Sequence, residues 1–289
     1  MIFLKNTLFI FSFLLIIPAS AQSIDAALKT NPLLELGINT KILGLKGNIK
    51  EMQERKFIID DQGHTTNYSI LLSNQYKFDS NGLTQEIEET ISNSQSKKSF
   101  FSYTNKGFVS HIDIETTLYS NEKDTTDTNS EKDPIFSTVD YKYVQKKNIL
   151  FKGEDSTENN PQKVTTRKEY FYHFNDDNQI FQVDYQTTDV VTKYNYDVNG
   201  LIKESLTLKS GAPFYKKMYK YDRNNRLINI VTLNSDNTTK YPNEETVITY
   251  KLDSNGNAME KKVKNYLYSS KGTKELNEGY LFLYNYTYL

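Results

Sequence analysis

Apolar and polar residues alternate one by one along much of this chain, and one short turn sequence interrupts the alternation again and again. The alternating stretches carry aromatic residues at positions i and i+2, such as Tyr194 with Tyr196 and Tyr219 with Tyr221. Side chains two positions apart lie on the same face of a strand. Each stretch therefore predicts a strand with one aromatic face and one polar face, as in an antiparallel sheet that is covered on one side.

The interrupting sequence is Asp-x-Asn-Gly or a close variant of it. Asp favours the start of a type I turn, and Gly or Asn then takes the left-handed position that closes a hairpin with a bulge. The residues predicted at that position are Gly82, Gly107, Asn178, Gly200, Asn225 and Gly256. Most spacings between them correspond to one hairpin plus a link. A repeat of this kind predicts a sheet built from successive hairpins.

The start of the chain has the features of an export signal. Lys5 precedes the apolar run Leu8–Ile17, and small residues end at Ala21, after which we expect cleavage. The run is shorter than the about 20 apolar residues that span a bilayer. We therefore predict a signal peptide over residues 1–21 and no transmembrane helix after its removal.

The mature chain divides into two parts. Residues 22–56 form an N-terminal segment with an entry strand and, at most, a short helix within Ile24–Leu36, where Asp25 could cap the helix. Residues 57–289 form the hairpin repeat domain. Two polar stretches, near 121–134 and 153–163, are predicted as mobile surface insertions.

Composition excludes several classes of protein. The whole chain has 35 basic and 36 acidic residues; removing residues 1–21 removes only Lys5, so the mature net charge is 34 − 36 = −2. This charge gives no electrostatic case for nucleic acid as a partner. The chain has no cysteine, so an exported form has no disulfide, no thiolate metal site and no lipid-attachment cysteine.

The pattern Tyr-x-Tyr-Asp-x-x-Gly-x-Leu resembles the YD repeat of the RHS family and the secreted YD-repeat proteins of Bacteroidota. The match is best at Tyr194–Ile202 and Tyr219–Leu227, and weaker copies cover most of residues 57–272. The resemblance implies an all-β, antiparallel hairpin-repeat sheet that meanders. It supplies no catalytic residue, and the repeats are too few for the toxin-enclosing shell of the large RHS proteins.

Metal and catalytic chemistry have little support in the sequence. Asp-x-Asn-Gly is part of a calcium loop, but Lys77, Lys251 and Lys262 stand where such a loop needs oxygen ligands, so turn chemistry is the better interpretation. The histidines, His64, His111 and His173, have no metal-ligand spacing, and no nucleotide-binding or nucleophile motif occurs. We predict no cofactor, no metal and no enzymatic activity.

The tyrosine ladders have two interpretations. They can pack the core through cross-strand aromatic pairs, or they can form an exposed strip that stacks on flat ligands such as sugar rings. Under the second interpretation the candidate ligand-binding residues are Tyr194, Tyr196, Tyr219 and Tyr221. The predicted partner is then a glycan or a protein of the cell envelope.

The C-terminal strand favours a different class of protein. Aromatic residues alternate without a break from Tyr280 to Tyr288, as in the last strand of an outer-membrane barrel. Other strands, such as Thr84–Glu89, would place charges on both faces, which lipid disfavours, and a strand that caps the edge of the repeat sheet would look the same. Our first prediction is an exported, non-catalytic binding or structural protein of the periplasm, cell surface or extracellular space. The alternative is an outer-membrane β-barrel or channel, and a glycan-directed enzyme is third.

Overall fold

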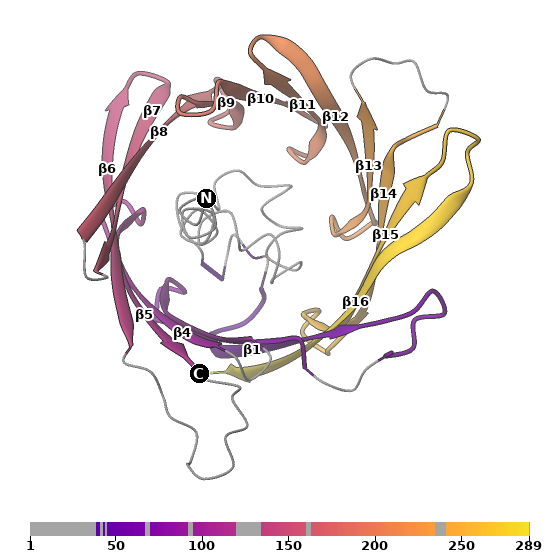
Figure 1. Cartoon of the computed structure of the whole chain (residues 1–289), viewed down its shortest axis with the longest axis horizontal. Coiled ribbons are helices and arrows are strands. Elements are labelled where there is room, and N and C mark those ends of the chain that lie inside the picture. The colour runs from indigo at the N-terminus through magenta and orange to yellow at the C-terminus, as the bar shows by residue number, and fades with distance from the viewer. Residues whose placement is uncertain are drawn as a thin grey trace.

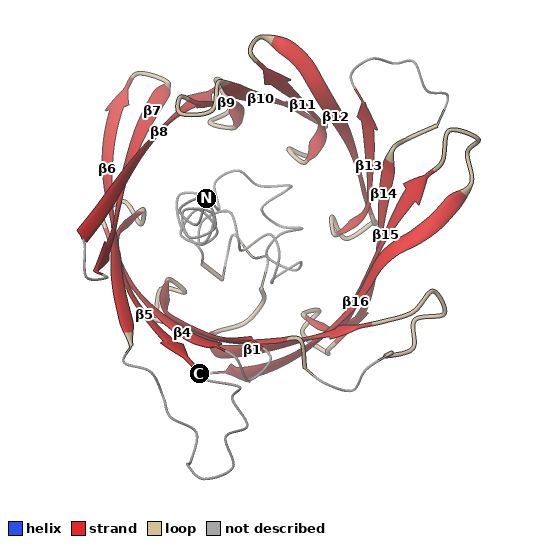
Figure 2. Ribbon diagram, viewed as in Figure 1, coloured by secondary structure: helices blue, strands red, loops and turns tan. Residues whose placement is uncertain are grey.

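The chain forms a ring of antiparallel strands that closes on itself (Figures 1 and 2). The computed structural model describes residues 39–40, 43, 45–66, 70–91, 95–119, 134–159, 163–234 and 241–288, and these residues contain strands and no helix. Strands that follow one another in sequence are neighbours in the ring. The sixteen strands are β1 (Ile49–Ile58), β2 (Leu72–Phe78), β3 (Thr84–Ile91), β4 (Gln95–Tyr103), β5 (Val109–Leu118), β6 (Ile135–Lys146), β7 (Ile149–Asn159), β8 (Lys163–Phe174), β9 (Ile180–Tyr185), β10 (Val190–Tyr196), β11 (Ile202–Lys209), β12 (Ala212–Tyr221), β13 (Leu227–Asn234), β14 (Glu244–Leu252), β15 (Ala258–Tyr268) and β16 (Lys274–Tyr288).

Pairing of β1 with β16 closes the ring. Met52 of β1 stands opposite Tyr286 of β16 on one side and opposite Tyr76 of β2 on the other. The predicted all-β, antiparallel hairpins are confirmed, but the open, meandering sheet is wrong. An open sheet leaves two edges of unpaired N–H and C=O groups, and the long last strand removes both edges by pairing with the first.

The predicted turns form where expected. Asp197 accepts hydrogen bonds on Oδ1 from the backbone N–H groups of Asn199 (2.8 Å) and Leu201 (2.9 Å), and Asp79, Asp222 and Asp253 repeat this arrangement. All six residues predicted in the left-handed region have a positive φ, including the non-glycine residues Asn178 (58°) and Asn225 (62°). These turns follow β2, β4, β8, β10, β12 and β14, so they share one end of the barrel. With the Lys147–Asn148 connection after β6, they define the turn end; the opposite end, with the longer connections, is the loop end.

A short strap crosses the turn end before β1 begins. The backbone N–H of Thr40 donates to the carbonyl of Gly82 (2.9 Å), and that of Lys46 donates to Asn257 Oδ1 (2.7 Å). The strap therefore joins the β2–β3 turn to the β14–β15 turn, beneath the seam between β1 and β16. A side chain at Gly82 would collide with Thr40, so glycine is needed there for this contact as well as for the turn.

The aromatic face of the sheet points into the barrel. Leu43 and Leu45 of the strap pack against the same cluster as Tyr76, Phe282 and Tyr284, and Figure 1 shows the indigo residues that precede β1 inside the ring. Side chains on this face are buried although only one layer of strands forms the wall; Tyr172 and Phe282 are 0% exposed. Such burial fits the concave side of the wall, where side chains converge.

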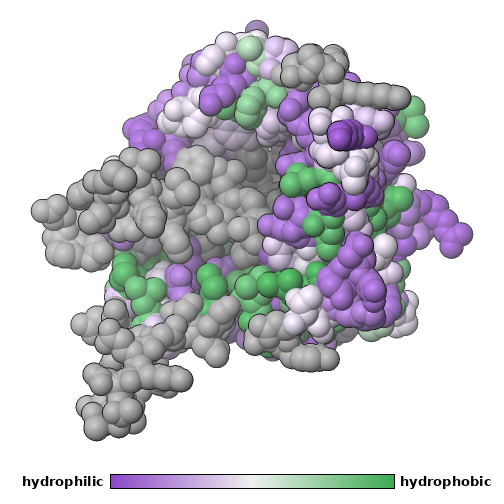
Figure 3. All heavy atoms as spheres, turned by 45° about the vertical axis from the view of Figure 1, so that its right-hand side comes forward, coloured by the Kyte–Doolittle hydropathy of each residue, from purple (hydrophilic) through white to green (hydrophobic). Residues whose placement is uncertain are grey.

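The outer face is polar. Cross-strand ion pairs cover it, such as Lys77 with Glu86 (3.0 Å) and Lys216 with Glu204. Figure 3 shows mainly hydrophilic residues over the part of the outer surface that it presents, with single hydrophobic residues among them. The alternation predicted from the sequence is thus resolved into an aromatic inner wall and a charged outer wall.

The surface loop predicted over 153–163 is wrong for most of its length. Strand β7 continues to Asn159 and β8 begins at Lys163, so only residues 160–162 lie between them. The stretch is polar on both faces because Glu154 and Ser156 point into the barrel while Asp155 points outward, and this polarity obscured the strand. The predicted signal peptide (1–21), the short helix (Ile24–Leu36) and residues 121–133 of the other insertion lie outside the described residues.

Candidate functional site on the inner wall

Six tyrosines near the turn end fasten their strands to the strands before them. Each hydroxyl donates a hydrogen bond to the backbone carbonyl of the first residue in the preceding strand. We call these contacts the tyrosine latches. They join Tyr103 to Thr84 (2.6 Å), Tyr143 to Val109 (2.7 Å), Tyr196 to Ile180 (2.6 Å), Tyr221 to Ile202 (2.9 Å), Tyr250 to Leu227 (2.9 Å) and Tyr286 to Ala258 (2.8 Å). The carbonyl that accepts each bond follows the preceding turn, so the latches tie successive repeats together.

The four predicted ligand-binding tyrosines all lie on the inner wall. Tyr196 and Tyr221 are latches, so their hydroxyls bond the wall itself. Tyr219 is 7% exposed and its hydroxyl lies 3.0 Å from Ser205 Oγ, while Tyr194 is half-buried and packs against the core. These contacts are those of packing residues. Their predicted binding of a ligand stays a prediction.

The inner wall changes in character from one end of the barrel to the other. In the strands that run toward the turn end, a polar inward residue precedes two aromatic or apolar ones, as Thr192 precedes Tyr194 and Tyr196. The polar members of this pattern are Asn74, Lys168, Thr192, Lys217 and Thr246. Sequence reasoning missed them because a lone Lys or Thr in a strand looks like part of a solvated face. The signal was their phase, two residues before the tyrosine pair.

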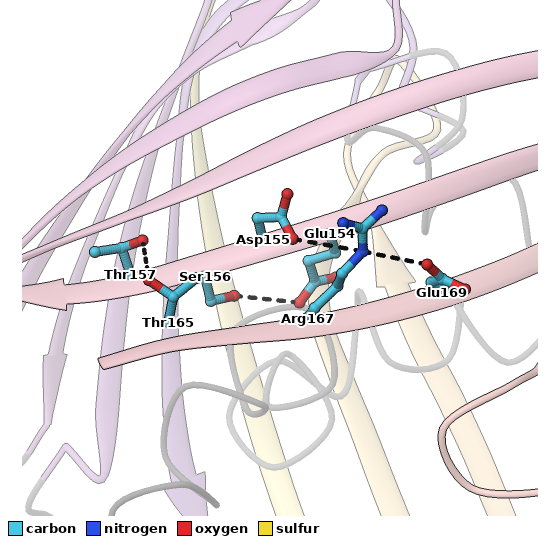
Figure 4. Close-up of polar contacts among 7 residues, drawn as sticks. All are labelled: Glu154, Asp155, Ser156, Thr157, Thr165, Arg167 and Glu169. Carbon is cyan, nitrogen blue, oxygen red and sulfur yellow. Dashed lines mark hydrogen bonds and ion pairs between the residues drawn. The ribbon is translucent and has the colours of Figure 1, made fainter. Parts of the chain in front are cut away.

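Charged side chains are buried in the inner wall of β7 and β8. Lys152 is 2% exposed and Glu154 is 3% exposed. The ammonium of Lys152 lies 4.7 Å from the ring centre of Tyr141 and 5.1 Å from that of Tyr170, distances typical of cation–π contacts. Glu154 lies 3.6 Å from the Lys168 ammonium. Figure 4 shows the Ser156–Glu154 contact at this site.

A second buried group of the same composition lies where the ring closes. Glu54 of β1 is 0% exposed and accepts a hydrogen bond from Asn74 Nδ2 (3.1 Å). The ammonium of Lys56 lies 3.8 Å from the ring centre of Tyr280, and that of Lys261 lies 5.4 Å from the ring centre of Phe282. The structure thus brings together residues of β1, β2, β15 and β16, which no local pattern in the sequence connects.

The histidines belong to the outer wall and the loop end. His111 Nδ1 lies 2.8 Å from Asp140 and its Nε2 lies 3.0 Å from Asp113, while His173 Nε2 lies 2.8 Å from Asp184. His64 lies beside Asp60 in the β1–β2 connection. His173 was predicted on the polar face of its strand, and that is where it lies. These contacts join neighbouring strands and bring no third ligand-bearing side chain to either histidine pair beyond those named, within the described ranges.

Neither a metal centre nor a membrane helix is found in the part of the chain that the structure describes. No group of three or more His, Asp or Glu side chains there could hold a metal ion. No helix there is long and apolar enough to cross a membrane. The predicted lack of enzymatic activity stays a prediction.

Comparison with known proteins gives solved structures only. No protein-family model matches the chain, and no curated protein matches it. The chain is similar to a porin-like protein from Bacteroides uniformis, with 10% identity and a TM-score of 0.39 over 84% of this chain and 99% of that one. It is also similar to a porin-like protein from Bacteroides vulgatus, with 12% identity and a TM-score of 0.33 over 83% and 99%. With TM-scores below 0.5, nothing about the activity of this chain follows from the likeness.

These findings correct the family assignment and reorder the predicted functions. The resemblance to YD and RHS repeats is wrong as an assignment, because no family model matches and the hairpins close into a barrel. The closed sixteen-strand barrel supports the alternative, an outer-membrane β-barrel or channel, better than the open binding sheet that was predicted first. An envelope location agrees with the predicted export at this coarse level.

Proposed function

We propose that the protein is an exported β-barrel of the cell envelope that acts through its interior, holding or passing small solutes along a tyrosine-rich wall. One observation carries the proposal. The ring is closed by β1 and β16, and buried lysine and glutamate side chains lie on its inner wall among aromatic rings. Buried charges are costly unless they have partners, so a wall that keeps them inside is better suited to meet polar solutes there than to serve only as a core. A non-catalytic role and a glycan as the solute are part of this proposal.

The outer wall decides the finer placement of the barrel. Lys98, Arg167 and Lys216 stand near the middle of their strands on the outer face, in ion pairs with carboxylates. A Lys or Arg on the lipid side of a barrel costs about 2–4 kcal/mol at the midplane. Three such residues would cost about 6–12 kcal/mol, as much as the whole folding free energy of a typical domain, about 5–15 kcal/mol. We therefore place the outer wall against water or a polar partner.

The second candidate is a channel that spans the outer membrane. It is favoured by the closed antiparallel ring, by short turns at one end with longer connections at the other, and by the aromatic last strand. In this candidate, polar partners or lipid headgroups must cover the ion pairs of the outer wall.

Fractionation of cells that export the protein separates the two candidates. The envelope fraction is washed with alkaline carbonate, and the protein is run on a gel with and without heating. We expect a heat-dependent mobility, because a closed barrel resists detergent, and release by carbonate, because the outer wall is charged. A heat-modifiable protein that stays in the membrane pellet would favour the channel. A mobility that does not depend on heating would contradict both candidates.

A further inference from the structure

We infer that the two buried lysine–glutamate groups are matched binding sites for a carboxylate-bearing sugar. The inference rests on the proposed function and names its class of solute. We call the groups the β7 site, built on Lys152, Glu154 and Lys168, and the β1 site, built on Glu54, Lys56 and Lys261. In each, one strand carries a Lys and a Glu two positions apart, and a neighbouring strand adds the second Lys.

The formal charge of each site is positive. Two lysines and one glutamate give +1 at the β7 site. The same sum applies at the β1 site, where Glu89 and Lys97, the next inward pair along the β3–β4 ladder, cancel one another. A buried excess of positive charge favours the uptake of an anion, because the low local dielectric strengthens the attraction. A single carboxylate neutralises one site.

Each site also contains a buried polar atom without a hydrogen-bond partner among the described residues. At the β7 site it is the hydroxyl of Tyr141, a side chain that is 93% buried and stands directly opposite Glu154 across the ladder. At the β1 site it is Oδ1 of Asn74, whose amide nitrogen donates to Glu54. A buried polar group left without a partner costs free energy. Tyr141 can donate to a carboxylate, and Asn74 can accept from a sugar hydroxyl.

The aromatic rings around the lysines complete the chemistry of both sites. Tyr141 and Tyr170 flank Lys152, and Tyr280 and Phe282 flank Lys56. Tyrosine combines an apolar ring face with a hydroxyl, which suits a sugar ring that has both apolar faces and hydroxyl edges. Cations, hydroxyl partners and ring faces together favour a sugar acid over a neutral sugar.

The two sites lie half-way around the ring from one another. In ring order β7 is eight strands from β15, and β8 is eight strands from β16. Both are built on inward side chains next to the tyrosine layer of the turn end. Their matched composition at opposite points of one wall is the arrangement expected of sites that serve a shared interior.

Titration of the full-length mature protein with glucuronate and with glucose tests the inference. Binding is followed by calorimetry. We expect glucuronate to bind and glucose to bind at least about tenfold more weakly, since a hydrogen bond to a charged group contributes roughly that factor. Equal binding of both sugars, or no binding of glucuronate, would overturn the inference.

Tyr141→Phe gives the sharpest variant, with Tyr143→Phe as its matched control. Tyr141→Phe removes a hydroxyl without a partner, so we expect weaker glucuronate binding and unchanged stability. Tyr143→Phe removes a latch, so we expect lower stability and unchanged binding. If Tyr141→Phe binds glucuronate as the parent does, the β7 site is not the binding site.

The lysines give an independent check. Lys152→Met and Lys56→Met should each remove part of the binding, whereas Lys193→Met on the outer wall should remove none. A closed, heat-modifiable barrel that ignores glucuronate would refute only this inference. A protein whose mobility does not depend on heating would refute the proposed function as well.

Discussion

At the scale of single residues, the tyrosines and aspartates of the repeat perform different tasks. Each turn aspartate gathers backbone N–H groups and shapes the hairpin, as Asp222 does with Asn224 (2.8 Å) and Arg226 (3.0 Å). Each latch tyrosine then ties a strand to the strand before it. The recurring sequence is therefore explained by local bonds of the wall, and binding is left to residues that the repeat does not fix.

Replacing Tyr221 by Phe removes one latch. We expect the free energy of unfolding to fall by about 1–3 kcal/mol, because the buried carbonyl of Ile202 loses its donor. Denaturant unfolding of the parent and the variant measures the change. Tyr141→Phe is the matched control and should be close to neutral; equal losses in both variants would show that the latch hydroxyl has no special role.

The turn at Asp222 should make stability depend on pH. Burial alone would raise the pKa of Asp222, but hydrogen bonds from the backbone and side chain of Arg226 outweigh it and lower that pKa below its usual value. A lowered pKa in the folded state stabilises the protein above the ordinary value, about 3.9, and the stabilisation is lost as the pH falls through the folded value.

Asp222→Asn should therefore lower the unfolding midpoint at about pH 7 and lose most of this deficit at about pH 2, below the usual aspartate pKa. Asp177→Asn serves as the control, because Asp177 enters its turn through a backbone N–H that donates to Asn175. A deficit for Asp222→Asn that is the same at both pH values would contradict the account.

At the scale of the strand, the alternation of side chains is the main determinant of the wall. The predicted period of two holds through β7, where Glu154 points inward and Asp155 points outward beside Arg167 (Figure 4). The sequence could not say which face is concave, since the same alternation fits an open sheet and a barrel of either polarity. That choice depends on closure, which is a property of the whole ring.

Cysteine labelling of adjacent positions in β4 tests the direction of the two faces. The chain has no native cysteine, so each introduced thiol is the only one present. Lys98→Cys on the outer wall should react rapidly with a water-soluble maleimide. Ser99→Cys, at a position that is 0% exposed, should react slowly until the protein is denatured. The opposite order of rates would mean that the aromatic face points outward.

At the scale of the whole molecule, closure joins parts of the chain that are far apart in sequence. The turns and the antiparallel hairpins were predictable because Asp-x-Asn-Gly and the aromatic alternation act over a few residues. The pairing of Gln53 with Asn285 was not predictable, because the two residues are separated by 232 positions. The β1 site was missed for the same reason, since Glu54 and Lys261 meet only when the ring closes.

The closed ring is the central claim, and a disulfide between β1 and β16 tests it most directly. Gln53 and Asn285 stand opposite one another on the outer wall. Facing residues of antiparallel strands have Cα atoms about 4.5–5.5 Å apart, within reach of a disulfide. We predict that Gln53→Cys with Asn285→Cys crosslinks within one chain on mild oxidation, whereas Gln53→Cys with Lys193→Cys on β10 does not. Failure of the first pair to crosslink in the folded protein would show that the sheet is open and would contradict the account.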